Sequence, residues 1–388
     1  MNFIERREFM NQKNWKRMAA GAMAVLICAS ALTGCGAKND TGSAQKDTNV
    51  TVAKGPEVTK EVVKVNDQEI SVGEFQYYVY NTAMMKAYSI DSGFTGDPTT
   101  IDWDQKTESG KALAEDVVNE ALDTAISEVL TVQKGKENGV ENSADQQSQA
   151  DQAVDSFIAQ SGQEQFDLTA NAMAINSADD YKKLYSRMMT VQAVQDDIQA
   201  NPDKYMTNKD ELKKYKSDKK ATVQHILIMN DSDKAEDPKA AIDQVLARAK
   251  AGEDFYQLMQ EFNEDTGETE AGYTFGPGEM VKEFEEAAFA LDYDQISEVV
   301  QSEYGYHIIK RLVGTAELQN YWKESAKIEK NDKVIKEISV QEITQAAANA
   351  QKKLQEQSKS SAASSANTGT AGAAGGQTTD GNGGNANG

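Results

Sequence analysis

The chain has 388 residues and carries 62 acidic against 40 basic side chains, a formal net charge of −22 at pH 7. This length is enough for more than one domain of ordinary size, and so acidic a surface is repelled by phosphate, so nucleic-acid binding is not expected. There are two cysteines, Cys28 and Cys35, and two histidines, His225 and His307. With so few of these side chains, neither a disulfide framework nor a metal centre is predicted.

Residues 1–34 have the pattern of an export signal. Basic residues gather in 1–17, the run Met18–Leu32 is almost wholly apolar, and Leu32-Thr33-Gly34-Cys35 follows. The apolar run is shorter than the about 20 residues that span a membrane comfortably. The last four residues resemble a lipobox, whose cysteine is acylated. We therefore expect Cys35 to anchor the chain in membrane lipid on the extracytoplasmic face, with a plain signal peptide as the alternative.

Residues 35–60 and 61–218 differ in pattern. The first segment is polar, lacks apolar periodicity and predicts a flexible tether. In the second, Glu61–Val65 alternates like a strand, and Ser71-Val72-Gly73-Glu74 has the Ser-x-x-Glu form that begins a helix. Further helices are predicted over 110–137, 144–160, 178–200 and 209–215. We interpret 61–218 as an N-terminal, mainly helical chaperone domain.

Methionines are spread through these predicted helices: Met84, Met85, Met173, Met188, Met189 and Met206. Methionine adapts to irregular apolar surfaces, so such residues can line a groove for unfolded chains. At helical spacing they more often belong to a core, and the core interpretation is favoured for any one of them.

Both histidines lie in residues 219–314, each in a run of β-branched and apolar residues. The runs Thr222–Ile228 and Tyr304–Lys310 predict strands, in which alternate side chains share a face. Helices are predicted between them, over Pro238–Ala251 and around Phe284–Leu291. Two strands with helices between them, in about a hundred residues, predict a compact α+β domain.

Six short motifs follow one another across this stretch: His225-Ile226-Leu227, Gly252-Glu253-Asp254-Phe255, Gly278-Glu279-Met280-Val281-Lys282-Glu283-Phe284-Glu285, Ala287-Ala288-Phe289, Ile296-Ser297 and Tyr304-Gly305-Tyr306-His307-Ile308-Ile309-Lys310. In this order they resemble the parvulin family of peptidyl-prolyl isomerases. The strand, turn and helix that open at residue 61 are similar to the start of the exported PrsA-type foldases, which have a SurA-like architecture. The resemblance implies a small antiparallel sheet with surrounding helices, inserted in a mainly helical foldase domain.

The resemblance also implies where the site lies. Met280 and Phe284, four apart on one helix face, would form an apolar slot for a proline ring, with Phe289 as its floor or as part of the core. His225 and His307 would form an imidazole pair behind the slot. Ordinary core packing is the alternative for Met280 and Phe284. For the histidines, a pair that only stabilises the fold is an equally good interpretation, because the reaction transfers no proton.

Further site positions follow from the same resemblance. Asp265 falls where the family carries an aspartate or cysteine facing the substrate carbonyl, with a solvated loop acid as the alternative. Ser302 falls at the hydroxyl position that bonds the histidine pair. The family run Gly-Gly-x-Leu-Gly is replaced here by Glu270–Gly276, and Phe275 is our candidate for the place of its leucine.

Isomerisation of an X-Pro bond needs no covalent step and no cofactor. Turning the bond breaks amide resonance, so the barrier is about 18–20 kcal/mol and the uncatalysed turn is slow. A site that binds the twisted amide better than the planar one accelerates the turn. An apolar slot removes water that favours the planar, more dipolar amide, while fixed hydrogen-bonding groups hold the carbonyl.

The loop at 230–237 bears on the substrate class. It reads Asn-Asp-Ser-Asp-Lys-Ala-Glu-Asp, whereas parvulins that prefer phosphorylated Ser/Thr-Pro carry a basic cluster there, able to pair with phosphate. The acidic loop would repel a phosphate. Unphosphorylated X-Pro bonds in unfolded or partly folded secreted proteins are therefore the expected substrate.

The segments after residue 314 divide into two kinds. Residues 315–357 are predicted to be mainly helical, and by the resemblance they pack back on 61–218, which makes the parvulin domain an insertion. Residues 358–388 are Ser, Ala, Gly, Asn and Thr with no large apolar side chain, so a disordered tail is expected.

Together these features predict a membrane-anchored peptidyl-prolyl isomerase that acts as a foldase for exported proteins. The alternative is a binding-only chaperone, or holdase, whose parvulin domain is inactive; the altered 270–276 run keeps this alternative open. A solute-binding lipoprotein would need two lobes with a repeated α/β pattern, which the sequence lacks.

Overall fold

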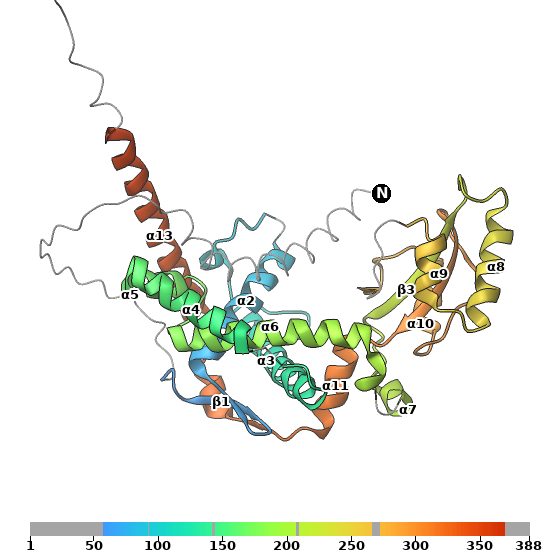
Figure 1. Cartoon of the computed structure of the whole chain (residues 1–388). Coiled ribbons are helices and arrows are strands. Elements are labelled where there is room, and N and C mark those ends of the chain that lie inside the picture. The colour runs from blue at the N-terminus through green and yellow to red at the C-terminus, as the bar shows by residue number, and fades with distance from the viewer. Residues whose placement is uncertain (1–56, 92, 142–143, 207–208, 266–271, 369–388) are drawn as a thin grey trace, which may run out of the picture.

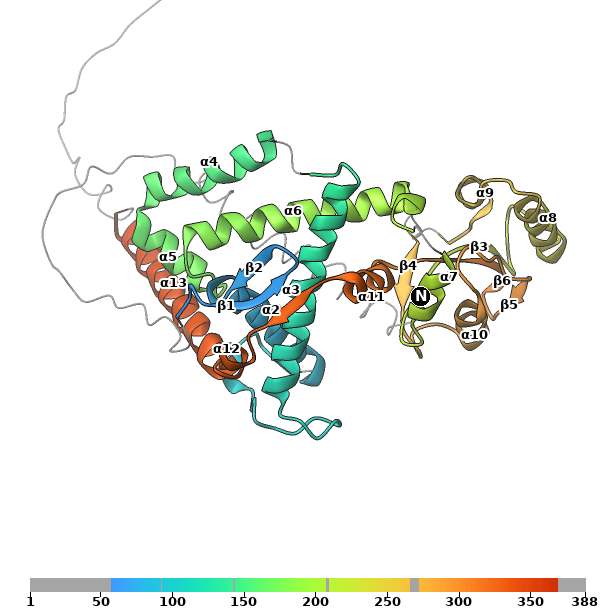
Figure 2. The same ribbon diagram turned by 90° about the horizontal axis from the view of Figure 1, so that it is seen from below.

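The computed structural model describes residues 57–91, 93–141, 144–206, 209–265 and 272–368. The export signal, Cys35 and most of the tether and tail lie outside these ranges. The described chain has a helical part, made of 57–215 with 315–368, and a sheet part, 221–312 (Figures 1 and 2). The predicted fold class, small antiparallel sheets with a mainly helical domain, is confirmed.

The helical part begins with β1 (Glu61–Val65) and β2 (Gln68–Ser71). Its helices are α2 (Val72–Ile90), α3 (Leu113–Glu137), α4 (Ala144–Ser161), α5 (Gln163–Asn171), α6 (Ala178–Ala200), α7 (Lys209–Leu212), α11 (Thr315–Ser325), α12 (Asp332–Lys336) and α13 (Val340–Thr368), with 3-10 turns at η2 (Pro98–Thr100), η3 (Pro202–Lys204) and η4 (Lys213–Tyr215). The predicted capping box is confirmed, because the Glu74 N–H donates to Ser71 Oγ at 3.2 Å. Helix α5 has no counterpart among the predicted helices. Gly162, at φ 86°, separates it from α4.

A small sheet joins the two ends of the described chain. Strand β1 lies in the middle of the order β2-β1-β7, and β7 (Ile328–Lys330) pairs with it antiparallel, with Val63 opposite Lys330 and Val65 opposite Ile328. The Asn331 N–H donates to Val62 O at 2.9 Å. A segment more than 250 residues later therefore completes the sheet that opens the helical part.

Side chains from both segments share one hydrophobic core. Phe75 of α2 and Leu130 of α3 are buried in the same cluster as Leu318 and Trp322 of α11 and Ile343 of α13. Burying one side chain of this size contributes about 1.5–3 kcal/mol. The two segments of the helical part thus stabilise each other, and Figure 2 shows α13 lying along the side of α5 and α2.

Most of the methionines lie in or against this core. Met84 and Met206 are buried, and Met173 and Met188 pack against the cluster. Met189 is half-buried, while Met85 is 48% exposed. Packing in this core accounts for four of the six side chains.

A buried polar network ties three helices together. Arg187 of α6 places Nη2 2.8 Å from Glu74 Oε1 of α2, and its Nη1 donates to Tyr78 Oη at 3.0 Å. The Tyr78 hydroxyl donates to Glu128 Oε2 of α3 at 2.7 Å. Burial raises the pKa of Glu128. Since a buried charge is costly without partners, the network fixes how these helices pack.

The sheet part is a four-stranded antiparallel sheet in the order β4-β3-β6-β5. Its elements are β3 (Ala221–Met229), α8 (Pro238–Lys250), α9 (Phe255–Phe262), β4 (Tyr273–Phe275), α10 (Lys282–Ala290), β5 (Val300–Gln301) and β6 (Gly305–Leu312). Ile226 and Ile308 face α8 and α9. Val223 and Ile309 face α10 on the other side. Alternate residues of β3 and β6 therefore pack into two different hydrophobic cores, one on each face of the sheet.

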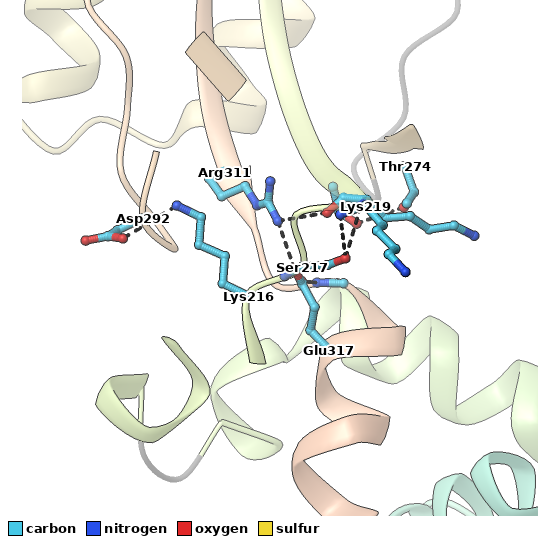
Figure 3. Close-up of polar contacts among 10 residues, drawn as sticks. Lys216, Ser217, Lys219, Thr274, Asp292, Arg311 and Glu317 are labelled. Carbon is cyan, nitrogen blue, oxygen red and sulfur yellow. Dashed lines mark hydrogen bonds and ion pairs between the residues drawn. The ribbon is translucent and has the colours of Figure 1, made fainter. Parts of the chain in front are cut away.

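The two parts meet at a buried ion pair (Figure 3). Glu317 Oε1 accepts from Arg311 Nη2 at 2.8 Å and from the Ser217 N–H at 3.2 Å, and Oε2 accepts from the Gly314 N–H at 2.7 Å. Arg311 also donates to Lys220 O at 3.2 Å. One carboxylate thus holds both places where the chain passes between the parts.

Helix α13 extends into the segment for which a disordered tail is expected. It runs from Val340 to Thr368 and so includes residues 358–368. The physical reason is composition: from residue 315 to 368 there is neither Gly nor Pro, and alanine favours helix. Within the described ranges, every helix is too short or too polar to serve as a membrane-spanning segment.

Candidate active site

The two histidines come from the two central strands of the sheet part. In the antiparallel register of β3 and β6, His225 is opposite Ile309 and His307 is opposite Leu227. These two pairs are two residues apart along the strands, so both histidines lie on the same face of the sheet. Their ring centroids are 5.6 Å apart, at an interplanar angle of 55°. Both side chains are buried, with 3% and 5% exposure. The strands thus bring together the two residues predicted to pair.

Ser302 fixes the orientation of His307. Its Oγ lies 2.7 Å from His307 Nε2 and accepts the Tyr304 N–H at 3.1 Å. The Ser302 N–H donates to Gly305 O at 2.9 Å, which closes the turn before β6. Because this contact forms with either atom as the donor, Ser302 holds the ring of His307 in one orientation whichever ring nitrogen carries the proton.

The protonation of His307 follows from its surroundings. Burial, followed by the proximity of His225, lowers the pKa of His307 to about 4, and Asp265 opposes this shift. Two imidazoles packed together in an apolar setting cannot both be charged at low cost. At neutral pH His307 is therefore uncharged, and its Nε2 keeps the contact with Ser302 Oγ in the neutral ring.

Asp265 lies on the open side of the pair. Its Oδ2 is 3.5 Å from His225 Nε2, and its side chain is 48% exposed. The segment is held against β3: Asn263 Oδ1 accepts the Leu227 N–H at 2.8 Å and the Asp265 N–H at 3.2 Å, and the Glu264 N–H donates to Leu227 O at 2.9 Å. The chain therefore places this carboxylate by backbone contacts with the strand that carries His225.

Phe284 packs against both histidines. Its ring meets His225 edge-on at 5.2 Å and His307 at 5.3 Å, and it is 3% exposed. Met280 is half-buried and packs against the same cluster. Helix α10 begins at Lys282, so Met280 lies just ahead of it and Phe284 in its first turn.

Phe275 and Phe289 lie beneath this layer. Phe275 is 2% exposed, and its ring is 5.9 Å from that of Phe284 and 5.7 Å from that of Phe289. Phe289 is half-buried and faces the Arg311 guanidinium, 6.0 Å from its ring centroid. Both side chains support Phe284 from below.

Tyr273 is a site residue that the sequence reasoning missed. Its half-buried ring is edge-on to His225 at 5.7 Å and stacks with Phe284 at 6.3 Å and 14°. Strand β4 places Tyr273 opposite Val223 and Phe275 opposite Ala221, so both rings lie on the histidine face. The alternation Tyr-Thr-Phe was the available signal, because aromatic residues two apart share a strand face.

The cluster has a definite chemical character. Rings and a methionine surround two buried imidazoles, with a carboxylate at one side and a hydroxyl at the other. In the described part of the chain, no group of three or more His, Cys, Asp or Glu side chains is arranged to hold a metal ion. Such a surface suits an apolar ring next to a polar amide.

Residues 205–313 match the family model described as the PPIC-type peptidyl-prolyl isomerase domain. Foldase protein PrsA 4 of Bacillus cereus is 42% identical over 128 residues, which are 32% of this chain and 42% of that protein. Foldase protein PrsA 3 of the same species is 36% identical over 171 residues, 43% of this chain and 54% of that protein. The chain thus spans about half, or less, of the length of the curated relatives it matches.

Solved structures were compared as well. PrsA from Bacillus subtilis is 22% identical, with 64% of this chain and 91% of that chain covered at a TM-score of 0.23. A SurA-like chaperone of Campylobacter jejuni is 19% identical, with 79% and 98% covered at a TM-score of 0.20.

Proposed function

We propose that this chain, whose residues 205–313 are a parvulin-type peptidyl-prolyl isomerase domain, is a membrane-anchored foldase that isomerises X-Pro bonds in exported proteins. The observation that carries the proposal is the packing of Phe284 edge-on against both His225 and His307, with Met280 beside it. This apolar layer is the surface on which a proline ring would rest.

Catalysis would come from binding the twisted amide. When the proline ring rests on Phe284 and Met280, water is removed from the amide, and water favours the planar, more dipolar form. A carbonyl turned toward Asp265 would meet a carboxylate, which disfavours the negative charge that the planar amide places on its oxygen. The histidine pair, in which Ser302 fixes the neutral His307, would hold Phe284 and the sheet in place.

Phosphorylated substrates would be excluded by charge. The loop 230–237 carries exposed Asp231, Asp233, Glu236 and Asp237 against one exposed lysine, Lys234. A phosphate beside four carboxylates would be repelled rather than paired. We therefore assign unphosphorylated, unfolded or partly folded exported chains as clients.

The domain boundaries are also a proposal. We infer that 61–218 and 315–357 form one chaperone domain and that 219–314 is an isomerase domain inserted into it. The pairing of β7 with β1 and the core shared by Phe75 and Trp322 support this division. An inserted isomerase would keep a client near both surfaces at once.

The anchor rests on residues outside the described ranges. Acylation of Cys35 would hold the mature chain on the extracytoplasmic face of the membrane. The Cys35→Ser variant should then be released from cells in soluble form, whereas the parent stays with the membrane fraction. If the variant stays with the membrane fraction, the proposal that acylated Cys35 is the anchor is wrong.

The holdase alternative is tested in refolding. A client whose slow refolding phase is proline isomerisation is refolded with the parent and with the double variant Met280→Ala, Phe284→Ala. The proposal expects the parent to shorten the slow phase and the variant to lose this effect while both suppress aggregation. Suppression of aggregation by the parent, without any change in the slow phase, would support the binding-only chaperone instead.

A further inference from the structure

Two large apolar residues with exposed side chains lie where β3 ends and β6 begins. Met229 is 36% exposed and Tyr304 is 39% exposed. Among the described residues, the other exposed large apolar side chains are on α2: Met85, Tyr88 and Ile90. An apolar side chain that is exposed next to a candidate active site is a candidate contact for a ligand.

The strand register places Met229 next along the histidine face. It follows His225 and Leu227 at alternate positions of β3, and it is opposite Gly305, one same-face step beyond the pair Leu227–His307. Such a step is about 7 Å, twice the rise per residue of a strand. Consecutive Cα atoms of a bound peptide are about 3.8 Å apart, so a residue adjacent to a proline held over Phe284 and His307 reaches Met229.

Gly305 keeps this place open. A Cβ there would lie 2.2 Å from Ile228 O and 2.8 Å from Met229 Cα. The strands approach too closely at this point for any side chain at position 305. The backbone of Gly305 therefore lies opposite Met229, and the Met229 side chain has room to contact a ligand.

Both apolar residues are positioned by the contacts that also position the site. The Met229 N–H donates to Glu264 Oε2 at 2.7 Å, and Glu264 directly precedes Asp265. The Tyr304 N–H donates to Ser302 Oγ, which bonds His307, and Tyr304 O accepts the Asn230 N–H at 3.1 Å. Met229 and Tyr304 thus have fixed backbones on either side of one strand end.

We propose that Met229 forms a subsite for the side chain of the residue that precedes proline, and that this subsite selects a large apolar residue such as leucine or phenylalanine. The inference rests on the proposed isomerase function. The residue before proline supplies the carbonyl of the bond that turns. A carbonyl held toward Asp265 puts that residue on the side of the cluster where Glu264 and Met229 meet.

Charge at the rim offers the competing preference. Asp265 is half exposed and could favour lysine or arginine before proline. Both oxygens of Glu264, in contrast, already accept hydrogen bonds, from the Met229 N–H and from Ser232 Oγ. The exposed carboxylates of the loop 230–237 follow Met229 in the chain, whereas Met229 itself lies on the histidine face, so we place the selection on its apolar side chain.

The test is an NMR measurement of cis/trans exchange in a set of peptides. Five of them differ in the residue before proline, which is Ala, Leu, Phe, Lys or Glu, and a sixth has Leu after proline. The probe is the chain from residue 35 with Cys35→Ser. We expect kcat/KM for Leu-Pro and Phe-Pro to exceed that for Ala-Pro by about fivefold, the scale of a few apolar groups in a half-open site. Leucine after proline should give no such gain.

Variants locate the preference. Met229→Lys should bring the ratio of Leu-Pro to Ala-Pro close to one, and Met229→Leu should keep it. Met229→Ala should lower the ratio and serves as the second variant if Met229→Lys does not fold. Met85→Lys, which changes an exposed methionine on α2, is the matched control and should have the parent ratio.

The outcomes separate the two proposals. A parent that accelerates Ala-Pro but shows no preference for Leu-Pro would overturn the subsite alone, as would a preference for Lys-Pro or for leucine after proline. A leucine preference that survives Met229→Lys would place the subsite elsewhere. No acceleration of any peptide by folded protein would overturn both the isomerase and its subsite.

Discussion

Arg311 and Glu317 form an ion pair of 2.8 Å at the junction of the sheet part and the helical part, with side-chain exposures of 0% and 4%. Arg311 lies on the same strand face as His307, and its guanidinium is 6.0 Å from the ring of Phe289, below the histidine cluster. Tyr293, from the segment after α10, is buried in the core of the helical part. The junction is therefore continuous with the floor of the candidate site on one side and with the helical core on the other.

Removing the carboxylate of Glu317 should strongly destabilise the protein. In Glu317→Gln, Arg311 keeps its charge inside the protein without a counter-charge, and breaking a buried pair costs about 3–5 kcal/mol. Denaturant unfolding measures this change in the free energy of unfolding. The matched control is Glu286→Gln, which breaks the exposed pair with Lys282 on α10 and should cost under about 1 kcal/mol. Equal effects of the two substitutions would show that the junction pair is not a structural clamp.

Acidification should destabilise the fold through His307. Its pKa is about 4 in the folded chain and has its ordinary value near 6.5 in the unfolded chain. Between these values the unfolded chain binds a proton that the folded chain does not, so stability falls as pH decreases through this window and is constant above it. For this one group the loss from pH 7 to pH 4 is roughly 3 kcal/mol.

A variant isolates this contribution from the titration of carboxylates. In His307→Gln the unfolding free energy should fall less steeply between pH 6.5 and pH 4 than in the parent. Parallel pH profiles for the two proteins would contradict the assignment. The titration of His307 should leave isomerase activity flat from pH 6 to pH 8, because a group with a pKa of about 4 stays uncharged over this range.

Loss of the Ser302 hydroxyl should leave a buried ring nitrogen without its partner. In Ser302→Ala, His307 Nε2 and the Tyr304 N–H both lose the Oγ contact, and an unsatisfied buried polar group costs about 1–3 kcal/mol. Thermal unfolding and the NMR signals of the His307 ring measure the two effects. Ser89→Ala, which removes an exposed hydroxyl that donates to Lys86 O on α2, should change neither. An unshifted His307 ring in Ser302→Ala would show that the hydroxyl does not orient it.

Local sequence patterns predicted the elements that carry the site. Alternation of apolar residues around His225 and His307 predicts the two strands that form. The prediction that Met280 and Phe284 share a helix face is wrong, because α10 begins at Lys282 and leaves Met280 ahead of it. The register is not in these patterns, because it depends on which residues of β3 and β6 face each other. It is the register that sets the 5.6 Å between the imidazoles and brings Met229 to the end of their face.

Three features lie beyond what local pattern can predict. Tyr273 contacts Phe284 from a three-residue strand, whose alternation indicates that its two aromatic residues share a face but not which strand it pairs with. Strand β7 pairs with β1 across most of the chain, a contact that neither segment encodes by itself. The ion pair of Arg311 and Glu317 joins residues six apart in sequence, yet its burial depends on how the two parts meet.

The most direct test of the account is NMR exchange of an Ala-Pro peptide in the presence of the chain from residue 35 bearing Cys35→Ser, beside the same chain with Met280→Ala and Phe284→Ala. The account predicts fast cis/trans exchange with the parent and exchange at the uncatalysed rate with a folded double variant. Uncatalysed exchange with the folded parent, or equal acceleration by both proteins, would contradict the assignment of isomerase activity to this aromatic layer.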